Sequence, residues 1–362
     1  MQIELPISKS IANRWLILQA IHGDELMPVS DSMPDDVQIL HLALTTLHNT
    51  TQSNTTLHLS NCGTAMRFIT AYAAQLENRV TILDGVERMH HRPIGQLVDA
   101  LREIGADIEY LGEEGFPPLR IKGCILDKHR IVTINHPQST QFVSALLLIG
   151  ANVHTDSTSP YITLTREMIK NKEQGTKNKD KLLTTDQTQV TNLGSLLLAP
   201  YSEIERDWSS AAFWYEYVAL HGGEITLPGL YRDSLQGDKV VADIFAHLGV
   251  QTHYTTEGIV IYSSPLLSTP YTLHQDFASC PDLYPAVALT CERLGIGLHA
   301  EGTDSLPLKE SDRLRAVREH RTDADHRMAM ALMVAGYEVD DTACISKSYP
   351  QFMEHFRHLQ GM

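Results

Sequence analysis

A weak internal repeat constrains this sequence more than any other feature. In the first copy, residues 80–84 follow the apolar and polar alternation of a strand. Gly85 ends this stretch, and an amphipathic stretch then runs up to Gly105. The second copy places its two glycines, Gly229 and Gly249, at the same separation of 20 residues. Alternation predicts a strand and helical spacing predicts a helix. The repeat therefore predicts a chain built from units of strand, polar loop, helix and strand.

A third copy begins at 297–302 and keeps the register of the first two. Arg92, Gln236 and Lys309 each stand seven residues after the strand-ending glycine of their copy. The polar loops and helix starts carry basic residues, and backbone N–H groups at a helix N-terminus favour anions. We therefore expect the ligand side of the molecule there. The alternative is that such units look alike by chance.

Composition narrows the class of protein. The 362 residues are 43% hydrophobic and 20% charged, as in ordinary globular proteins, and the length favours about two domains. The net charge of −15 argues against a nucleic acid or an anionic membrane as partner. Five scattered cysteines without a CxxC motif favour a reducing compartment and no zinc site. With neither a leader nor a long apolar run, we expect a cytoplasmic protein.

One segment stands apart from this pattern. Residues 169–194 are polar, rich in Lys and Thr, and free of aromatic residues. Such a composition is typical of an exposed excursion, and the Lys residues there are expected to be solvated.

Several short segments pair a small or hydroxyl residue with a cation, as recognition of phosphate or carboxylate requires. Each alone is more often a helix cap or a surface pair. Together they predict a site for a small polyanion. The segments are Lys9-Ser10 with Arg14, 61–67 from Asn61 to Arg67, 91–95 around Arg92, Ser139-Thr140-Gln141, 309–313 from Lys309 to Arg313, Asp325-His326-Arg327 and Lys347.

In their order along the chain, these segments, together with Pro160-Tyr161 and Pro281-Asp282, resemble the 5-enolpyruvylshikimate-3-phosphate (EPSP) synthase family. The resemblance covers nearly the whole chain. It implies an α/β (α+β) fold of two similar domains, each made of repeated βαβαββ units in an inside-out α/β barrel, with the ligand cleft between them. The implied halves are residues 9–204, and residues 1–8 with 205–362.

The resemblance also implies the activity. Members of the family transfer the enolpyruvyl group of phosphoenolpyruvate to the 5-hydroxyl of shikimate 3-phosphate and release phosphate. The implied partners are these two small molecules, without a nucleic acid, a membrane, a metal or an organic cofactor. A monomer in the cytoplasm is expected.

The resemblance assigns roles to individual residues. Shikimate 3-phosphate would be held by Ser10, Arg14, Ser139, Thr140, Thr158, Tyr161 and Lys309, with Gln141 between the two ligands and with Asn61 and Ser305 as further contacts. Phosphoenolpyruvate would be held by Lys9, Gly63, Thr64, Arg92, Arg313, Arg327 and Lys347. Asp282 would be the base for the hydroxyl, and Glu310 the proton donor at the methylene carbon, assisted by Lys9. Such proton transfers suit carboxylates or Lys in a dry cleft.

The chain departs from the family at several positions. Thr140 and Thr158 replace Ser but keep a hydroxyl, and Ser305 replaces a common Asn. Cys62 replaces a common Ala, and a small buried thiol is the expected interpretation. The largest departure is a shortened third unit near 314–325, where the glycine expected at position 322 is Thr.

Other interpretations stay open. The sister UDP-N-acetylglucosamine enolpyruvyl transferase shares the implied fold, and a catalytically inactive anion-binding paralogue would suit the shortened unit. Glu310 could simply pair with Arg313 at the helical spacing of three residues. Asp282 could simply cap the helix that follows it.

Overall fold

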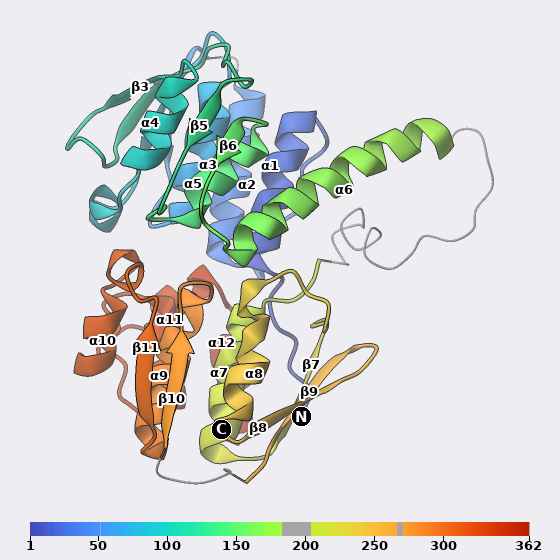
Figure 1. The fold of residues 1–362 in the computed structure, drawn as a ribbon, viewed down its shortest axis with the longest axis vertical. Helices are drawn as coiled ribbons and strands as arrows, with labels where there is room; N and C mark the ends of the chain where they lie inside the picture. The colour runs from blue at the N-terminus through green and yellow to red at the C-terminus, as the bar shows by residue number, and fades with distance from the viewer. Residues whose placement is uncertain (51, 183–203, 266–270, 362) are drawn as a thin grey trace. The chain divides into compact units, whose positions relative to one another are not determined.

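The computed structural model describes residues 1–50, 52–182, 204–265 and 271–361, and the chain divides into two compact units (Figure 1). Unit 1 comprises Met1–Lys9, Asp31–Asp35 and Glu205–Met362, and unit 2 comprises Ser10–Ser30 and Asp36–Ile204. This division differs from the boundaries expected from the sequence in that Lys9 and Asp31–Asp35 group with unit 1. One reason is that Gln351 Nε2 donates a hydrogen bond to the Ser32 carbonyl at 2.6 Å.

Unit 2 contains a four-stranded sheet of order β1-β2-β4-β3. Its strands and connecting helices are β1 (Asn54–His58), α3 (Gly63–Ala74), β2 (Val80–Asp84), α4 (Gly95–Glu103), β3 (Asp107–Tyr110) and β4 (Leu119–Lys122). The pair β1 and β2 is parallel, whereas β4 runs antiparallel to both of its neighbours. Every residue of α3 is buried, so this helix forms part of the unit's core.

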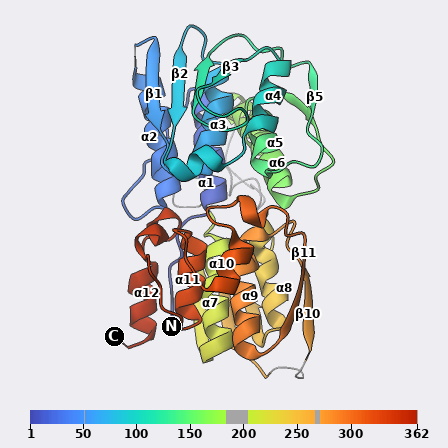
Figure 2. The ribbon, with the colours of Figure 1, turned by 90° about the vertical axis from the view of Figure 1, so that its left-hand side faces the viewer.

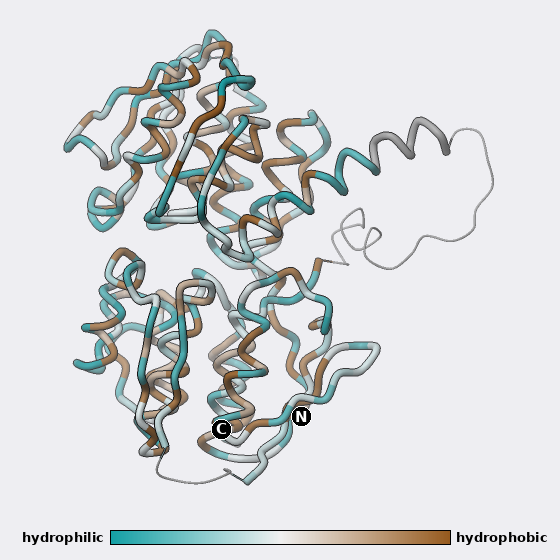
Figure 3. Tube along the Cα trace, in the orientation of Figure 1, coloured by the Kyte–Doolittle hydropathy of each residue, from teal (hydrophilic) through white to brown (hydrophobic). Residues whose placement is uncertain are grey.

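The rest of unit 2 includes a second, two-stranded parallel sheet of order β5-β6. Its elements are α1 (Lys9–His22), α2 (Asp35–Asn49), η1 (Glu87–His91), β5 (Ile131–Thr133), α5 (Thr140–Leu148), β6 (Asn152–His154) and α6 (Pro160–Leu182). Helix α5 packs against α3 and α6. The expected excursion at 169–194 begins as the continuation of α6, and residues 169–174 of this helix are mostly hydrophilic (Figure 3). Residues 183–194 lie outside the described residues.

Unit 1 repeats the first sheet of unit 2. Its elements are α7 (Trp208–His221), β7 (Glu224–Pro228), η3 (Gly237–Val240), α8 (Val241–Ala246), β8 (Val250–Tyr254) and β9 (Gly258–Ser263). The three strands have the order β7-β9-β8, and Gln2 forms a parallel bridge with Thr226 beside β7. The N-terminal residues therefore take the place that β1 holds in unit 2. The strand, helix and strand segments expected from the first two copies of the repeat are confirmed.

The second half of unit 1 is mostly helical. Its elements are β10 (Thr272–Asp276), η4 (Pro281–Leu283), α9 (Tyr284–Leu294), β11 (Gly297–Glu301), η5 (Leu306–Leu308), α10 (Arg313–Glu319), α11 (His326–Val334), η6 (Ala343–Lys347) and α12 (Phe352–Leu359). Strands β10 and β11 pair in parallel, and α9 packs against α7, α10 and α11 (Figure 2). Between residues 302 and 361 no further strand follows β11.

The third copy of the repeat ends without a glycine. Helix α10 stops at Glu319, and His320 takes the left-handed conformation with φ of 49°. Asp323 and Ala324 also have positive φ, at 46° and 56°, which non-glycine residues seldom adopt. This tight loop leads directly into α11. Among the helices of the described residues, none is long and apolar enough to cross a membrane.

Candidate active site

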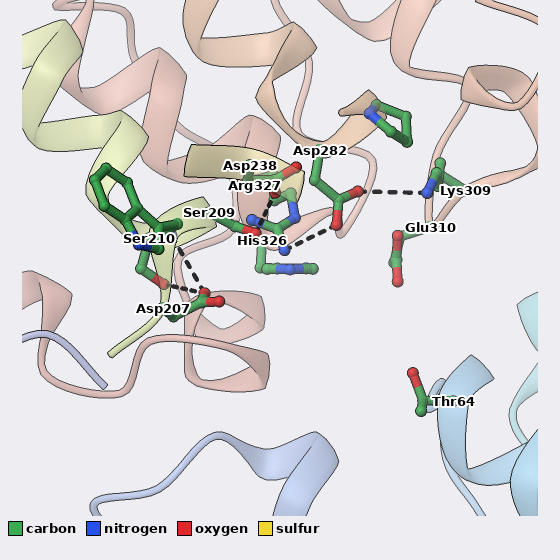
Figure 4. Close-up of polar contacts among 12 residues, drawn as sticks. Thr64, Asp207, Ser209, Ser210, Asp238, Asp282, Lys309, Glu310, His326 and Arg327 are labelled. Carbon is green, nitrogen blue, oxygen red and sulfur yellow. Dashed lines mark hydrogen bonds and ion pairs between the residues drawn. The ribbon is translucent and has the colours of Figure 1, made fainter. Parts of the chain in front are cut away.

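Asp282 lies at the centre of a group of ion pairs in unit 1 (Figure 4). It sits in η4, directly before α9. Its Oδ1 accepts a hydrogen bond from Arg313 Nη1 at 2.7 Å and lies 3.4 Å from Lys309 Nζ. Its Oδ2 lies 3.0 Å from Arg327 Nη2. These cations come from two other segments of unit 1, 309–313 and 325–327, which lie more than twenty residues from Asp282 in the sequence.

The surroundings of Asp282 hold its pKa well below the usual value. Burial alone would raise the pKa, but the charges of Arg327, Lys309 and Arg313 outweigh burial. The carboxylate is therefore ionised and a weak proton acceptor while these cations face it. The alternative that Asp282 caps α9 is not what the structure contains, since the N-cap is Leu283 and has no side-chain cap.

Arg313 is the most enclosed cation of this group, with 1% of its side chain exposed. Its Nε donates to Asp325 Oδ2 at 2.8 Å, and its Nη2 donates to Glu310 Oε2 at 3.2 Å. The pair with Glu310 at three-residue spacing, expected as an alternative, is thus present. Asp325 in turn caps α11 by accepting from Arg327 N at 2.9 Å. One carboxylate therefore fixes both a guanidinium and the start of a helix.

Two further carboxylates face Arg327 from the other side. Asp207 caps α7, where its Oδ2 accepts from Ser210 Oγ at 2.7 Å. Asp238 accepts a hydrogen bond from Ser209 Oγ. Burial raises the pKa of Asp207, and it raises that of Asp238 to about 6, while the charge of Arg327 opposes both shifts.

The remaining expected residues of unit 1 differ in how closely they join this group. Lys347, at the end of η6, lies with its Nζ 3.6 Å from Glu310 Oε1. Lys9 begins α1, and its charge acts on Asp207. Ser305 precedes η5, and within the described chain no side-chain hydrogen bond links it to these ion pairs.

In unit 2, Arg14 is surrounded by neutral groups. It is 3% exposed, and its Nε and Nη2 donate to Thr165 Oγ1 at 2.7 Å and to Ser144 Oγ at 3.0 Å. Its Nη1 donates to the Ser10 carbonyl at 2.9 Å, and its guanidinium carbon lies 5.9 Å from the centroid of the Tyr161 ring. Burial lowers the pKa of Arg14 to about 10, so the group remains positive at neutral pH.

The start of α3 gathers a second set of expected residues. A Cβ on Gly63 would lie 2.2 Å from Arg67 Nη1 and 2.7 Å from the Arg92 guanidinium, so any other residue here would require these two side chains to shift. Arg92 Nη1 donates to the Asn61 carbonyl at 3.2 Å. Cys62 is fully buried, and its Sγ accepts from Ala65 N at 3.3 Å, which confirms the expected buried thiol.

The start of α5 lies near the start of α3. Ser139 caps α5, and Gln141 Nε2 donates to Thr64 Oγ1 at 2.8 Å. Thr140 is the first residue of α5. Thr158, by contrast, is exposed in the loop before α6, and no side-chain hydrogen bond joins it to this set within the described residues.

Sequence reasoning missed several polar residues of both groups. Asp325, His326 and Arg67 lie inside the polar motifs of the sequence, but residue type and spacing alone give them no specific role. Asp207 is the cap of an Asp-x-x-Ser pattern, which is typical of a helix start. Ser144 and Thr165 gave no signal, because their partner Arg14 is more than a hundred residues away in the sequence.

Comparison with known proteins identifies the family of the chain as a whole. A family model described as EPSP synthase (3-phosphoshikimate 1-carboxyvinyltransferase) matches residues 40–321 and 318–356. The 3-phosphoshikimate 1-carboxyvinyltransferase of Bacteroides fragilis is 35% identical over 401 residues, covering 98% of this chain and 94% of the relative. That of Vibrio cholerae is 30% identical, covering 99% and 96%.

A solved structure shows the same fold. EPSP synthase from Acinetobacter baumannii superposes with a TM-score of 0.66 at 18% identity, over 99% of this chain and 95% of that chain. At this identity, the likeness concerns the fold alone. Because the family model matches most of the chain and full-length relatives share about a third of its residues, the chain belongs to the EPSP synthase family.

Proposed function

We propose that this chain performs the reaction of its family with the residues described above, transferring the enolpyruvyl group of phosphoenolpyruvate to the 5-hydroxyl of shikimate 3-phosphate. The observation that carries the proposal is the carboxylate of Asp282 with Lys309, Arg313 and Arg327 around it. Cations that share one carboxylate can exchange it for the phosphate or carboxylate of a ligand, which forms charge-assisted hydrogen bonds of the same kind.

Phosphoenolpyruvate would exchange with these internal carboxylates. Arg313 and Arg327 are held rigidly, at 1% and 2% exposure, so little side-chain entropy is lost when they bind an anion. Lys347 stands beside Glu310 and would bind the same ligand. The other proposed contacts to phosphoenolpyruvate are Lys9, Gly63, Thr64 and Arg92.

Shikimate 3-phosphate would meet the neutral surroundings of Arg14. A guanidinium whose hydrogen-bond acceptors are hydroxyl and carbonyl oxygens keeps its full charge for a phosphate. The further proposed contacts are Ser10, Asn61, Ser139, Thr140, Gln141, Thr158, Tyr161, Ser305 and Lys309. For Thr158 and Ser305 the support is the family resemblance.

Asp282, the proposed base, can accept a proton readily only when the neighbouring cations no longer depress its pKa. When the two anionic substrates engage Lys309, Arg313 and Arg327, the charges that depress the pKa of Asp282 are shared with the ligands. The carboxylate then becomes a better proton acceptor for the 5-hydroxyl, whose oxygen attacks C2 of phosphoenolpyruvate. The base is thus strengthened by the binding of its own substrates.

Glu310 is the proposed acid. Its side chain is 9% exposed and lies between Arg313 and Lys347. In the addition step it would protonate the methylene carbon. In the elimination step it would take a proton from the resulting methyl group as the bond to phosphate breaks, with Lys9 stabilising the charge.

We also propose the family's architecture for the chain. Residues 9–204, and 1–8 with 205–362, would form the two halves of an inside-out α/β barrel of βαβαββ units, with the substrates between them. The strand order that recurs in both units supports this proposal. The family model breaks at 318–321, which supports a shortened third unit near 314–325.

The proposed setting is a monomer in the cytoplasm. All five cysteines are free thiols, which suits a reducing compartment. Sedimentation at several protein concentrations would test the proposed state, and a mass that rises to that of a dimer would contradict it.

A phosphate-release assay tests the proposed reaction. Phosphoenolpyruvate is offered with shikimate 3-phosphate or with UDP-N-acetylglucosamine, and release is expected only with the first acceptor. Release with the nucleotide sugar alone would assign the sister activity. Release with neither acceptor, from protein that still binds shikimate 3-phosphate, would indicate an inactive anion-binding paralogue.

A further inference from the structure

Asp238 is a buried carboxylate that the proposed chemistry does not use. It is the second residue of η3 and is fully buried. Its Oδ2 accepts a hydrogen bond from Ser209 Oγ on α7, whereas its Oδ1 has no hydrogen-bond partner among the described residues. A buried carboxylate oxygen in this situation is costly when charged and is a natural place for a proton.

The charges that face Asp238 come from three elements. Arg327 on α11 favours the ionised form, whereas Asp282 of η4 and Asp207 at the start of α7 oppose it. Cys280, just before η4, is neutral because burial raises the pKa of its thiol to about 12. Figure 4 shows Asp207, Asp238 and Asp282 around Arg327.

Arg327 is therefore shared among three carboxylates. Only Asp282 forms a direct ion pair with it, at 3.0 Å, and its Nη1 has no hydrogen-bond partner in the described parts of the chain. Among the described residues, the interactions in this group join five cations and five carboxylates. The cations are Lys9, Lys309, Arg313, Arg327 and Lys347, and the carboxylates are Asp207, Asp238, Asp282, Glu310 and Asp325.

An anion that binds at Arg327 changes the charges that face Asp238. It engages the cation that favours ionised Asp238, and it brings additional negative charge close to the same carboxylate. Both changes raise the pKa of Asp238, which burial already places at about 6. The proton would come from solvent, would offset part of the added negative charge, and would go to Oδ1, because Oδ2 accepts from Ser209.

We propose that Asp238 takes up one proton when phosphoenolpyruvate binds at Arg327, so that anion binding and protonation of this carboxylate are coupled. The inference rests on the proposed function, because it takes Arg327 as a ligand contact. Asp238 acts through Arg327 and is a positioning residue; it touches neither substrate. The only bond formed in this step is the O–H bond between Oδ1 and the proton taken from solvent, and no bond of either substrate changes.

The test is the pH profile of kcat/KM for phosphoenolpyruvate at saturating shikimate 3-phosphate, from about pH 5.5 to about pH 8.5. The wild type is compared with Asp238→Asn, which cannot take up the proton, and with Asp243→Asn, which removes a charge from the exposed face of α8. We expect the ratio of Asp238→Asn to wild type to rise at least about fivefold between about pH 6 and about pH 8. The ratio for Asp243→Asn should stay constant.

A second variant keeps the proposal testable if Asp238→Asn does not fold. Ser209→Ala removes the hydroxyl that favours ionised Asp238, so the fall of kcat/KM should move to higher pH. A constant ratio for a folded Asp238→Asn, or an unmoved profile for Ser209→Ala, would overturn the coupling. If wild-type protein releases no phosphate with shikimate 3-phosphate, the proposed function itself fails.

Discussion

Arg313 of unit 1 and Arg14 of unit 2 are both buried guanidinium groups, but charged carboxylate oxygens surround the first and neutral oxygens surround the second. Carboxylates of Asp325, Asp282 and Glu310 surround Arg313 and raise its pKa. Hydroxyl and carbonyl oxygens surround Arg14, and burial lowers its pKa to about 10. Unit 1 thus neutralises its cations internally, whereas Arg14 keeps an unneutralised charge in unit 2.

These different surroundings imply that an anionic ligand would bind to the two arginines in different ways. In unit 1 a ligand must displace internal carboxylates, so binding can change the protonation of the site. Around Arg14 a ligand meets a charge that hydrogen bonds have already oriented, so binding should change little else. Each of the following variants tests one side of this contrast.

The largest effect is expected for Asp282→Asn. The amide cannot accept the hydroxyl proton, and turnover should fall by about 10² to 10⁴. Binding of shikimate 3-phosphate should stay within about tenfold of the wild type, because Arg14 and its partners are unchanged. Steady-state phosphate release and equilibrium binding measure the two quantities. Asp312→Asn is the matched control, since Asn can cap α10 as Asp312 does; near-wild-type turnover in Asp282→Asn would remove this carboxylate from the mechanism.

The next largest effect is expected on the free energy of unfolding, measured by urea denaturation of Arg313→Met and of Arg14→Met. Removing Arg313 leaves buried Asp325 without its ion-pair partner and takes one of two cations from Glu310, which typically costs about 3 to 5 kcal/mol. Removing Arg14 leaves Ser144 and Thr165, which already share a hydrogen bond of 3.0 Å, so the cost should be below about 1 kcal/mol. Equal losses in the two variants would contradict the contrast.

Glu216 on α7 tests whether the carboxylates of unit 1 depend on their cations. It is fully buried, and neither of its side-chain oxygens has a hydrogen-bond partner in the described residues. Burial raises its pKa well above the usual value, so the folded state keeps a proton that the unfolded state loses. Stability should therefore fall as pH rises from the unfolded pKa of about 4.3 toward the folded pKa.

Glu216→Leu should abolish this fall and gain about 1 to 3 kcal/mol at neutral pH. Urea denaturation at several pH values measures the gain, which should grow with pH. Glu224→Gln, at the exposed start of β7, is the control without such a trend. A gain that is the same at every pH would show that Glu216 is not protonated in the folded state.

The smallest effect on stability is expected in the loop before α11, which positions Asp325 beside Arg313. Ala324 has φ of 56°, a left-handed conformation that costs a non-glycine residue about 1 to 2 kcal/mol. Ala324→Gly should relieve part of this strain and stabilise the protein by about 0.5 to 1 kcal/mol, as thermal unfolding would detect. A loss of stability would mean that the loop is not strained at this residue.

The sequence alone predicted the local elements and the family well. The alternating segments at 80–84 and 224–228 are strands, and the helices end before Gly105 and Gly249, which have positive φ as expected of helix stops. These features depend on periodicity and on the backbone freedom of glycine, so they can be predicted from neighbouring residues. Membership in the family likewise followed from ordered motifs.

Only the tertiary structure decided what equivalent positions do. Arg92, Gln236 and Lys309 occupy the same place in the repeat, yet Arg92 lies against Gly63 at the start of α3. Gln236 is buried and donates to Glu205 Oε2 at 2.9 Å, whereas Lys309 lies 3.4 Å from Asp282. The partners come from distant parts of the chain, and a charge changes its pKa according to which partners and how much burial the fold provides. For that reason the sequence determined which cations this chain has, and the packing decided which of them are neutralised.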